Sequence, residues 1–242
     1  MTSTPIYNPM LFQDVFPENI VAFVSNRSVD FKLADGQSQL SLDQKSFVES
    51  SLGFPIKDPV NIRQVHGHAV VVIQSETDYA NYSIKEADAI TTNVVNVPIV
   101  IRTADCVPVF LHDTKNNAIA LIHAGWKSTQ QRIVQETLRT MKEMWGTRAE
   151  DVKAALGPAI QEGSCEVGNE FKQYFPNETL IIDGRLHCDI PQANINQLME
   201  SGVLKENIVD SQIDTVTNLD YFSYRREADA AGRMILLMMI KE

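Results

Sequence analysis

The 242-residue chain is poor in cysteine and in basic residues. Three cysteines, Cys106, Cys165 and Cys188, are too few for a disulfide framework, and an odd number leaves at least one of them unpaired within the chain. A reducing compartment is therefore expected. Lys and Arg number 21 against 31 Asp and Glu, so the formal net charge is −10. Because neutralising a nucleic-acid backbone requires clustered Lys and Arg, these counts argue against a protein that tracks nucleic acid.

Long apolar runs and linkers are also missing. Residues 1–5 lack the basic region and apolar run of a signal peptide, and the most apolar stretch, residues 234–240, is too short to span a bilayer. We therefore expect a cytoplasmic protein that binds neither membrane nor nucleic acid. No Pro-, Gly- or Ser-rich linker, charge block or internal repeat divides the sequence. This predicts a single domain over residues 1–242.

The hydrophobic pattern predicts strands and helices that alternate along the chain. Short apolar, β-branched runs predict buried strands at residues 20–24, 69–73, 97–101, 107–111, 118–122 and 152–156. Apolar residues at three- and four-residue intervals predict a helix from Ser128 to Trp145, ended by Gly146, and further helices are expected at 167–175 and 191–199. Residues 234–240 fit a buried strand or a helix end. Hairpin-length spacings in the first half argue against a doubly wound parallel sheet, so the predicted fold class is α/β (α+β), with mixed β-sheets flanked by helices.

Three residues with metal-binding side chains lie at the ends of predicted strands. His66 precedes the run at 69–73, Cys106 stands between two runs, and His123 ends the run at 118–122. Strand ends can converge in a sheet, and two His with one Cys suit a zinc site that keeps one coordination position open. Taken singly, each residue is more often structural, a buried thiol or a hydrogen-bonded imidazole. Their spacing matches no compact zinc-finger signature, so the residues alone only suggest a metal.

Eight short motifs then follow one another in the order found in the laccase-domain family, and the resemblance covers roughly residues 20–240. The motifs are QVHG (64–67), ADAITT (87–92), TADCVP (103–108), HAGW (123–126), LGPAI (156–160), EVG (166–168), ANINQL (193–198) and FSYRRE (222–227), followed by GRM (232–234). Members of this family include proteins called multicopper polyphenol oxidase, purine nucleoside phosphorylase and peptidoglycan editing factor.

The resemblance implies a fold, a metal site and an activity. It implies an α/β fold with mixed sheets, and a metal site at His66, Cys106 and His123. It further implies cleavage of adenosine or inosine, with guanosine and methylthioadenosine as further candidates, by phosphate to give base and ribose 1-phosphate. An accompanying adenosine deaminase activity is implied as well. The expected partners are therefore a small-molecule nucleoside and phosphate. The expected cofactor is zinc, with copper as an adventitious or alternative metal.

The implied reactions need a cationic phosphate site and an acid–base group. Guanidinium groups in or beside the motifs belong to Arg63, Arg102, Arg225 and Arg226, and guanidinium forks suit phosphate. Asp105 is the expected acid–base residue, beside the expected catalytic residues Cys106 and His123. Structural alternatives stay open, because the last two arginines could pair with neighbouring carboxylates and Asp105 could cap a turn or orient a ligand histidine.

Other functions and two departures from the family pattern also bear on the activity. A hydrolase of a peptidoglycan precursor would use Cys106 as nucleophile and His123 as base. A copper-dependent polyphenol oxidase would need more imidazole ligands than five histidines supply, and a non-enzymatic binding module has no support in the sequence. Arg27 is followed by Ser-Val-Asp where the family often has Gly-Gly. Asp214 stands where a Cys often precedes Thr, which places a carboxylate near the expected site in place of a thiol.

Overall fold

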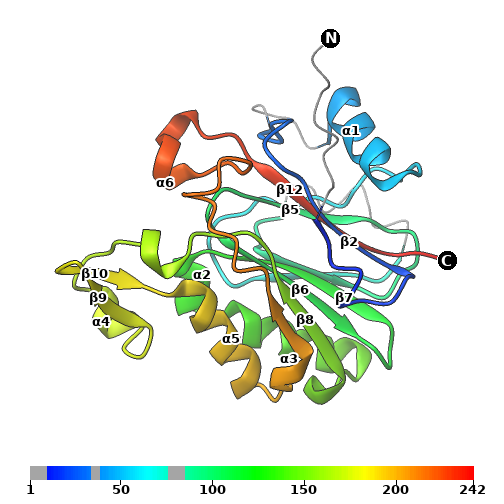
Figure 1. Cartoon of the computed structure of the whole chain (residues 1–242). Coiled ribbons are helices and arrows are strands. Elements are labelled where there is room, and N and C mark those ends of the chain that lie inside the picture. Colours follow the sequence, from blue (N-terminus) through cyan, green and yellow to red (C-terminus); the bar gives the residue numbers. More distant parts are fainter. Residues whose placement is uncertain (1–9, 34–38, 76–84) are drawn as a thin grey trace, which may run out of the picture.

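Two β-sheets face each other, and helices cover their outer faces (Figure 1). The computed structural model describes residues 10–33, 39–75 and 85–242. The first sheet has the strand order β1-β2-β12-β5, with bounds Met10–Leu11, Ile20–Val24, Met234–Ile240 and Ile99–Thr103. The second has the order β11-β8-β6-β7-β4-β3, with bounds Ile208–Asp210, Val152–Leu156, Val107–Asp113, Ala118–Ala124, Ala89–Thr92 and Val70–Ile73.

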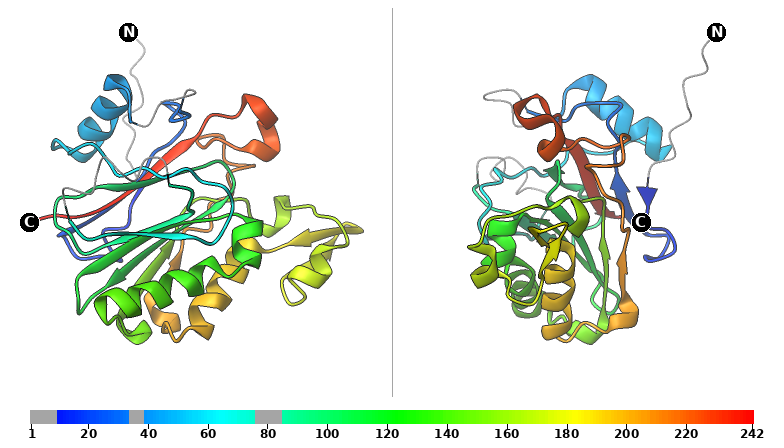
Figure 2. Two further views of the ribbon diagram at one scale, coloured as in Figure 1. Left: turned by 180° about the vertical axis from the view of Figure 1, so that it is seen from behind. Right: turned by 60° about the vertical axis from the view of Figure 1, so that its left-hand side comes forward.

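Strand directions confirm the expected mixed α/β architecture. The four-stranded sheet is antiparallel throughout. In the six-stranded sheet the outer pairs β11–β8 and β3–β4 are parallel and the inner pairs are antiparallel. Antiparallel neighbours β6 and β7 pair along their whole length, so the start of β6 and the end of β7 meet at one end of the six-stranded sheet. The left view of Figure 2 shows the green and gold helices packed along one face of this sheet. The candidate site lies where β6 starts and β7 ends.

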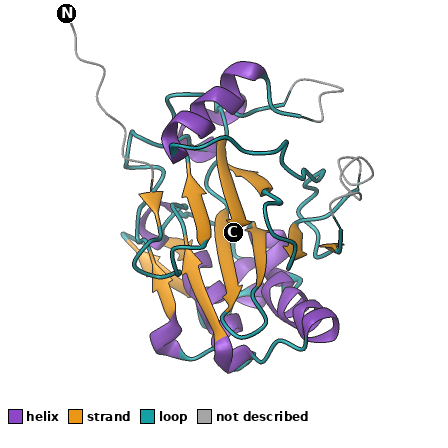
Figure 3. Ribbon diagram, turned by 90° about the vertical axis from the view of Figure 1, so that its right-hand side faces the viewer, coloured by secondary structure: helices purple, strands orange, loops and turns teal. Residues whose placement is uncertain are grey.

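Side-chain alternation along the strands divides the core into three layers. Ile119 and Leu121 of β7 face the other sheet, whereas Ala120 and Ile122 face the helices. The helices on this second face are α2, α3 and α5, with bounds Trp126–Gln130, Ile133–Trp145 and Ile190–Glu200. Helix α1, Leu42–Leu52, covers the outer face of the four-stranded sheet, as Figure 3 also shows. The layer between the two sheets is mainly apolar, and the polar side chains of the candidate site lie at the ends of the strands.

The remaining elements are short. They are the helices α4 (Phe171–Tyr174) and α6 (Tyr224–Glu227), the 3₁₀ turns η2 (Ala149–Asp151), η3 (Glu162–Ser164), η4 (Lys205–Asn207) and η5 (Ala228–Ala230), and the hairpin β9 (Thr179–Ile182) and β10 (Arg185–Cys188). In the described part of the chain, no helix is both long and apolar enough to cross a membrane.

Most predicted strands are confirmed, and two predicted helices differ from the structure. The helix expected from Ser128 to Trp145 is broken into α2 and α3, because Arg132 adopts a left-handed conformation with φ of 63°. The helix expected at 167–175 shrinks to α4, because the backbone of Val167 pairs with the hairpin, donating to Leu186 O at 2.8 Å. Residues 234–240 form the strand β12.

Candidate functional site

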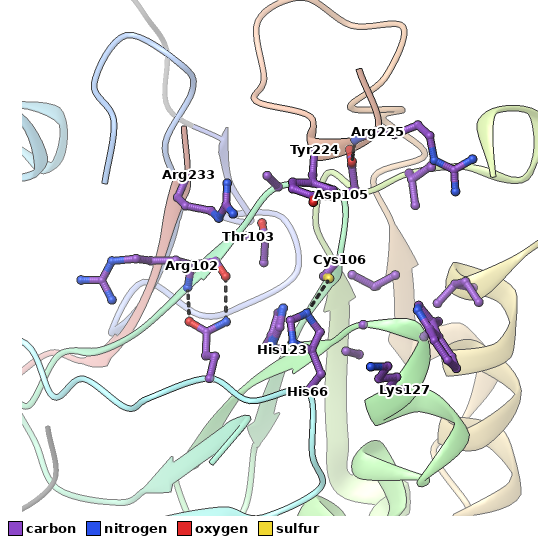
Figure 4. A pocket seen from close by; sticks show the side chains of 18 of the residues that line it. His66, Arg102, Thr103, Asp105, Cys106, His123, Lys127, Tyr224, Arg225 and Arg233 are labelled. Carbon is purple, nitrogen blue, oxygen red and sulfur yellow. Dashed lines mark hydrogen bonds between the residues drawn. The ribbon is translucent and has the colours of Figure 1, made fainter. Parts of the chain in front are cut away.

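The candidate site lies at the start of β6 and the end of β7, where the side chains of His66, Cys106 and His123 converge (Figure 4). Their donor atoms all lie within 4.8 Å of one another, and His66 Nε2 is 3.8 Å from Cys106 Sγ. His123 is buried at 3% exposure, Cys106 is half-buried and His66 is exposed. Among the described residues this is the one group of three or more His, Cys, Asp or Glu side chains arranged to hold a metal ion.

The strand register explains why Cys106 and His123 meet. Pro108 of β6 lies opposite His123 of β7. Because side chains alternate across a strand, Cys106, two residues before Pro108, shares with His123 the face that looks toward the other sheet. The polar interruption that was visible in the sequence between two apolar runs thus becomes the start of β6 with its thiol turned inward.

Asp88, which the sequence analysis did not single out as a site residue, holds two of the three donors in place. Its fully buried carboxylate lies 2.8 Å from His123 Nδ1 through Oδ1, and the same oxygen accepts from the backbone N–H of His66 at 3.0 Å. Oδ2 accepts from the N–H of Gly67 at 2.6 Å. Burial alone would raise the pKa of Asp88, but the hydrogen bonds from His123 and Gly67 hold it below its ordinary value. With Nδ1 occupied, His123 presents Nε2 toward Cys106.

Gly125 allows two of the donors, His66 and Cys106, to approach the start of α2. A Cβ atom at this position would lie 2.9 Å from His66 Cδ2 and 3.0 Å from Cys106 Sγ. Such contacts are closer than packed side chains tolerate, so the HAGW motif needs glycine here for space.

The donor set fits a zinc ion. Zn–S and Zn–N bonds of about 2.3 and 2.0–2.1 Å in tetrahedral geometry separate the two donor atoms by about 3.6 Å, close to the 3.8 Å between Cys106 Sγ and His66 Nε2. Three protein donors with one exposed side resemble zinc sites that keep a position for water or substrate. Copper also accepts such ligands, so the geometry shows that the group could hold a metal without fixing which one.

Electrostatics at the three donors favour a thiolate. Burial raises the pKa of the Cys106 thiol, yet the charge and hydrogen bonds of His123 and His66 outweigh burial and lower it to about 6. Burial lowers the pKa of His123, but Cys106 and Asp88 raise it to about 9. A thiolate is the form of cysteine that binds metals and acts as a nucleophile.

A pocket of about 850 Å³ opens over the three donors. This volume lies within the range of small-molecule sites. One side is lined by Trp126 and Phe171, whose ring centroids are 5.2 Å apart. Another part of the lining is formed by Thr103 at the end of β5 and by Arg233 just before β12, which lie near each other in Figure 4.

Arg63 and Arg102, two of the expected phosphate-binding arginines, line this pocket, but their guanidinium groups bind other residues of the chain. Arg63 is exposed and pairs with Glu86 at 3.2 Å. Arg102 is buried, and its Nε donates to Phe31 O at 2.7 Å while Nη1 donates to Asn61 Oδ1 at 2.5 Å. Figure 4 shows its guanidinium extending away from the three donors.

The other two expected arginines bind backbone carbonyl groups. Arg225 lines the pocket, but its Nη1 donates to Glu166 O at 2.9 Å. Arg226 lies outside the pocket lining. It donates to the carbonyl oxygens of residues 215, 216 and 221 at 2.7–2.8 Å and pairs with Glu227 at 2.9 Å. The position of Arg226 does not fit the expected phosphate contact, because its Nη1 and Nη2 groups bind carbonyl oxygens of the loop before α6.

Asp105 and Asp214, the two acidic residues that the sequence analysis named, differ in their surroundings. Asp105 lines the pocket with φ of 84°, and its two oxygens accept from Thr215 Oγ1 and from the backbone N–H of Arg225, both at 2.6 Å. Asp214 is not among the lining residues and accepts from Ser164 Oγ at 2.5 Å. The carboxylate that departs from the family pattern thus organises a loop behind the site.

Comparisons with known proteins agree with this fold. The family model described as multi-copper polyphenol oxidoreductase laccase matches residues 25–241. A purine nucleoside phosphorylase of Deinococcus radiodurans is 34% identical over 79% of this chain and 74% of its own length. Adenosine deaminase RL5, of an unknown prokaryotic organism, is 31% identical over 79% of both chains.

Two further matches differ in extent. A purine nucleoside phosphorylase of Bacteroides thetaiotaomicron is 37% identical over 63% of this chain, and the match spans 60% of that relative's length. The crystal structure of the Bacillus licheniformis hypothetical protein YfiH superimposes with a TM-score of 0.85 over 100% of this chain and 98% of that one, at 21% identity. The fold is therefore shared over the whole length.

Proposed function

Because the chain belongs to the family described as multi-copper polyphenol oxidoreductase laccase, we propose that it is a zinc-dependent purine nucleoside phosphorylase. It cleaves adenosine or inosine with phosphate to base and ribose 1-phosphate, and it also deaminates adenosine. The observation that carries this proposal is the convergence of His66, Cys106 and His123 in a pocket large enough for a nucleoside. The printed names of two relatives, a purine nucleoside phosphorylase and an adenosine deaminase, support it.

Different residues of the pocket are proposed to bind the purine and the metal. Trp126, 38% exposed and lining the pocket beside Phe171, offers an aromatic face to a purine. His66, Cys106 and His123 hold the metal, which when bound supplies a Lewis acid and a water of lowered pKa. In phosphorolysis a phosphate oxygen bonds to C1′ of the ribose while the C1′–N9 bond breaks. The bond's electron pair passes to the purine, which takes up the proton that the attacking hydrogen phosphate gives up.

Asp105 is the proposed proton-transfer residue. Its carboxylate is buried and lines the pocket beside Cys106. Thr215 and Arg225 each donate one hydrogen bond to it, and its two oxygens have further positions for a hydrogen bond to substrate or water, through which the proton of the phosphate can pass to the purine.

Product analysis tests this function. Purified protein is incubated with adenosine and with inosine, with and without phosphate, and its metal content is measured in the same preparation. The proposal predicts base and ribose 1-phosphate only when phosphate is present, inosine from adenosine in either case, and about one zinc per chain. Base release that is independent of phosphate would contradict it.

A cysteine hydrolase acting on a peptidoglycan precursor is the second candidate. The observation that favours it is the convergence of the Cys106 thiol with the imidazole of His123, the expected base, within 4.8 Å, beside His66, whose Nε2 lies 3.8 Å from Cys106 Sγ. Metal content separates the two functions, because a thiolate bound to zinc is not free to attack a substrate.

A copper oxidase is disfavoured by the number of ligands. A multicopper site needs several imidazole groups, whereas the described residues bring together two, those of His66 and His123.

A further inference from the structure

The part of the pocket lining that holds Thr103 and Arg233 contains a buried hydroxyl group without a hydrogen-bond partner among the described residues. Thr103 is 1% exposed and lines the pocket, yet its Oγ1 makes no hydrogen bond with any described residue. Buried polar groups are nearly always hydrogen-bonded in native proteins, so an exception needs an explanation. A ligand oxygen in the pocket would satisfy this hydroxyl.

Arg233 lines the same part of the pocket with most of its donors available. Its Nη1 donates to the carbonyl oxygens of Ala231 and Gly232 at 2.8 and 2.9 Å. For Nε and Nη2 the described part of the chain supplies no hydrogen-bond partner, and no described carboxylate forms an ion pair with this guanidinium. Its charge is therefore not neutralised by an ion pair with any described carboxylate, unlike that of Arg63 or Arg226.

Thr103 and Arg233 lie near each other at the neighbouring ends of two paired strands, and both line the pocket. Thr103, the last residue of β5, pairs with Met234, the first residue of β12, and Arg233 directly precedes that residue. Figure 4 shows the Arg233 guanidinium turned toward the side of the pocket where Thr103 lies. Arg102 also has an unpartnered nitrogen, Nη2, but its Nε and Nη1 are bound to Phe31 O and Asn61 Oδ1, and its guanidinium extends away from Thr103 (Figure 4).

We infer that Thr103 and Arg233 form the subsite for inorganic phosphate. Nε and Nη2 of Arg233 donate to two phosphate oxygens in the planar fork that guanidinium groups offer, and Thr103 Oγ1 donates to a third. The inference rests on the proposed phosphorolysis and transfers the phosphate contact from Arg63, Arg102, Arg225 and Arg226 to residues that the sequence analysis did not single out.

Two substitutions test the subsite through the kinetics of phosphorolysis. Thr103→Val removes the hydroxyl with little change of shape, and Arg233→Gln removes the charge. We expect the KM for phosphate to rise about tenfold in the first variant and about a hundredfold in the second. The KM for inosine should stay within about twofold of its original value. Arg148→Gln and Thr140→Val, which alter residues outside the pocket lining, serve as matched controls.

Phosphate binding without nucleoside keeps this inference separable from the proposed function. Inorganic phosphate should raise the Tm of the zinc-loaded original protein and of both controls, and should raise it much less in Thr103→Val and Arg233→Gln. Without phosphate, Thr103→Val should be at least as stable as the original protein, because it removes an unsatisfied group. A protein that shows this pattern but does not cleave nucleosides would overturn the proposed function and keep the subsite. Variants with an unchanged KM for phosphate and an unchanged Tm response would overturn the subsite.

Discussion

His123 Nδ1 lies 2.8 Å from Oδ1 of Asp88, a carboxylate with no exposure to solvent. The same oxygen accepts from the backbone N–H of His66, so one side chain fixes two of the three candidate metal donors. Asp88 precedes β4 and His123 is the last residue but one of β7, and the backbone N–H of His123 donates to Asp88 O at 2.7 Å. The positions of the donors are therefore set by the pairing of β4 and β7 as well as by the side chains.

Asp88→Asn should weaken metal binding by about 10- to 100-fold, the usual effect of losing a carboxylate that orients a ligand histidine. The amide has one acceptor oxygen where the carboxylate has two, and its NH₂ group would face backbone N–H donors. Competition with a chelator measures the affinity. Asp113→Asn is the control, because Asp113 is also fully buried and bonded to backbone N–H groups but lies at the other end of β6. Equal metal retention in the two variants would remove the positioning role from Asp88.

Gly125→Ala should release the metal with little loss of secondary structure. The added Cβ would come within 3.0 Å of His66 and Cys106, and these side chains can yield only by leaving their positions. Zinc content and circular dichroism of the purified variant are measured together. Gly163→Ala, where an added Cβ would meet no atom within 4 Å, should keep its zinc. A zinc-replete Gly125→Ala protein would show that the donors are not packed against α2.

Asp105→Asn should lower turnover by about a hundredfold, the typical effect of losing a general acid or base. Stability should change little, since the amide oxygen can accept from the backbone N–H of Arg225 while the amide NH₂ donates to Thr215 Oγ1. Thr215→Val tests the turn by itself, because it removes one hydrogen bond to Asp105 and leaves the charge. Turnover and thermal unfolding are measured for both variants. If Thr215→Val loses as much turnover as Asp105→Asn, then Asp105 acts through the turn and not through proton transfer.

The Asp113 carboxylate should stabilise the folded protein at neutral pH, and this contribution should be lost in acid. Burial raises the pKa of this carboxyl, but hydrogen bonds, including those from Asn116 and the backbone of Lys115, outweigh burial and hold it below its ordinary value. A carboxyl whose pKa is lower in the folded state stabilises the fold at pH above its unfolded pKa of about 3.9, and that contribution is lost as the pH falls through the folded value. Asp113→Asn should cost about 1–3 kcal/mol at pH 7 and progressively less below pH 4 in urea unfolding. A pH-independent difference would contradict this role.

The sequence predicted the parts of the fold that have a strong hydrophobic pattern. The strands at 20–24 and 118–122 were recognisable because nearly every residue in them is buried between two layers. Helix α1 was missed because few of its residues are buried, although Ser41 and Gln44 form a capping box that its sequence would have permitted us to find. The break at Arg132 could not be predicted, since it depends on a single residue adopting a left-handed conformation.

The candidate site was predictable in its donors and less so in its surroundings. His66, Cys106 and His123 stand out because they interrupt apolar runs. Asp88 is also a polar residue beside an apolar run, but its role depends on contacts with His66 and His123, which lie 22 and 35 residues away in the sequence. The arginines show the same limit, because sequence cannot show which guanidinium groups are consumed by backbone carbonyls. That depends on how the loop between residues 211 and 231 closes.

The central claim is that His66, Cys106 and His123 hold a zinc ion that turnover requires. The most direct measurement is phosphorolysis of inosine by protein stripped of metal with a chelator and then titrated with zinc. We expect activity to vanish on stripping and to return in proportion to zinc until about one equivalent is bound, with the Tm rising in parallel. His66→Ala should neither bind that equivalent nor recover. Full activity in the stripped protein, or stoichiometric zinc binding by His66→Ala, would contradict the claim.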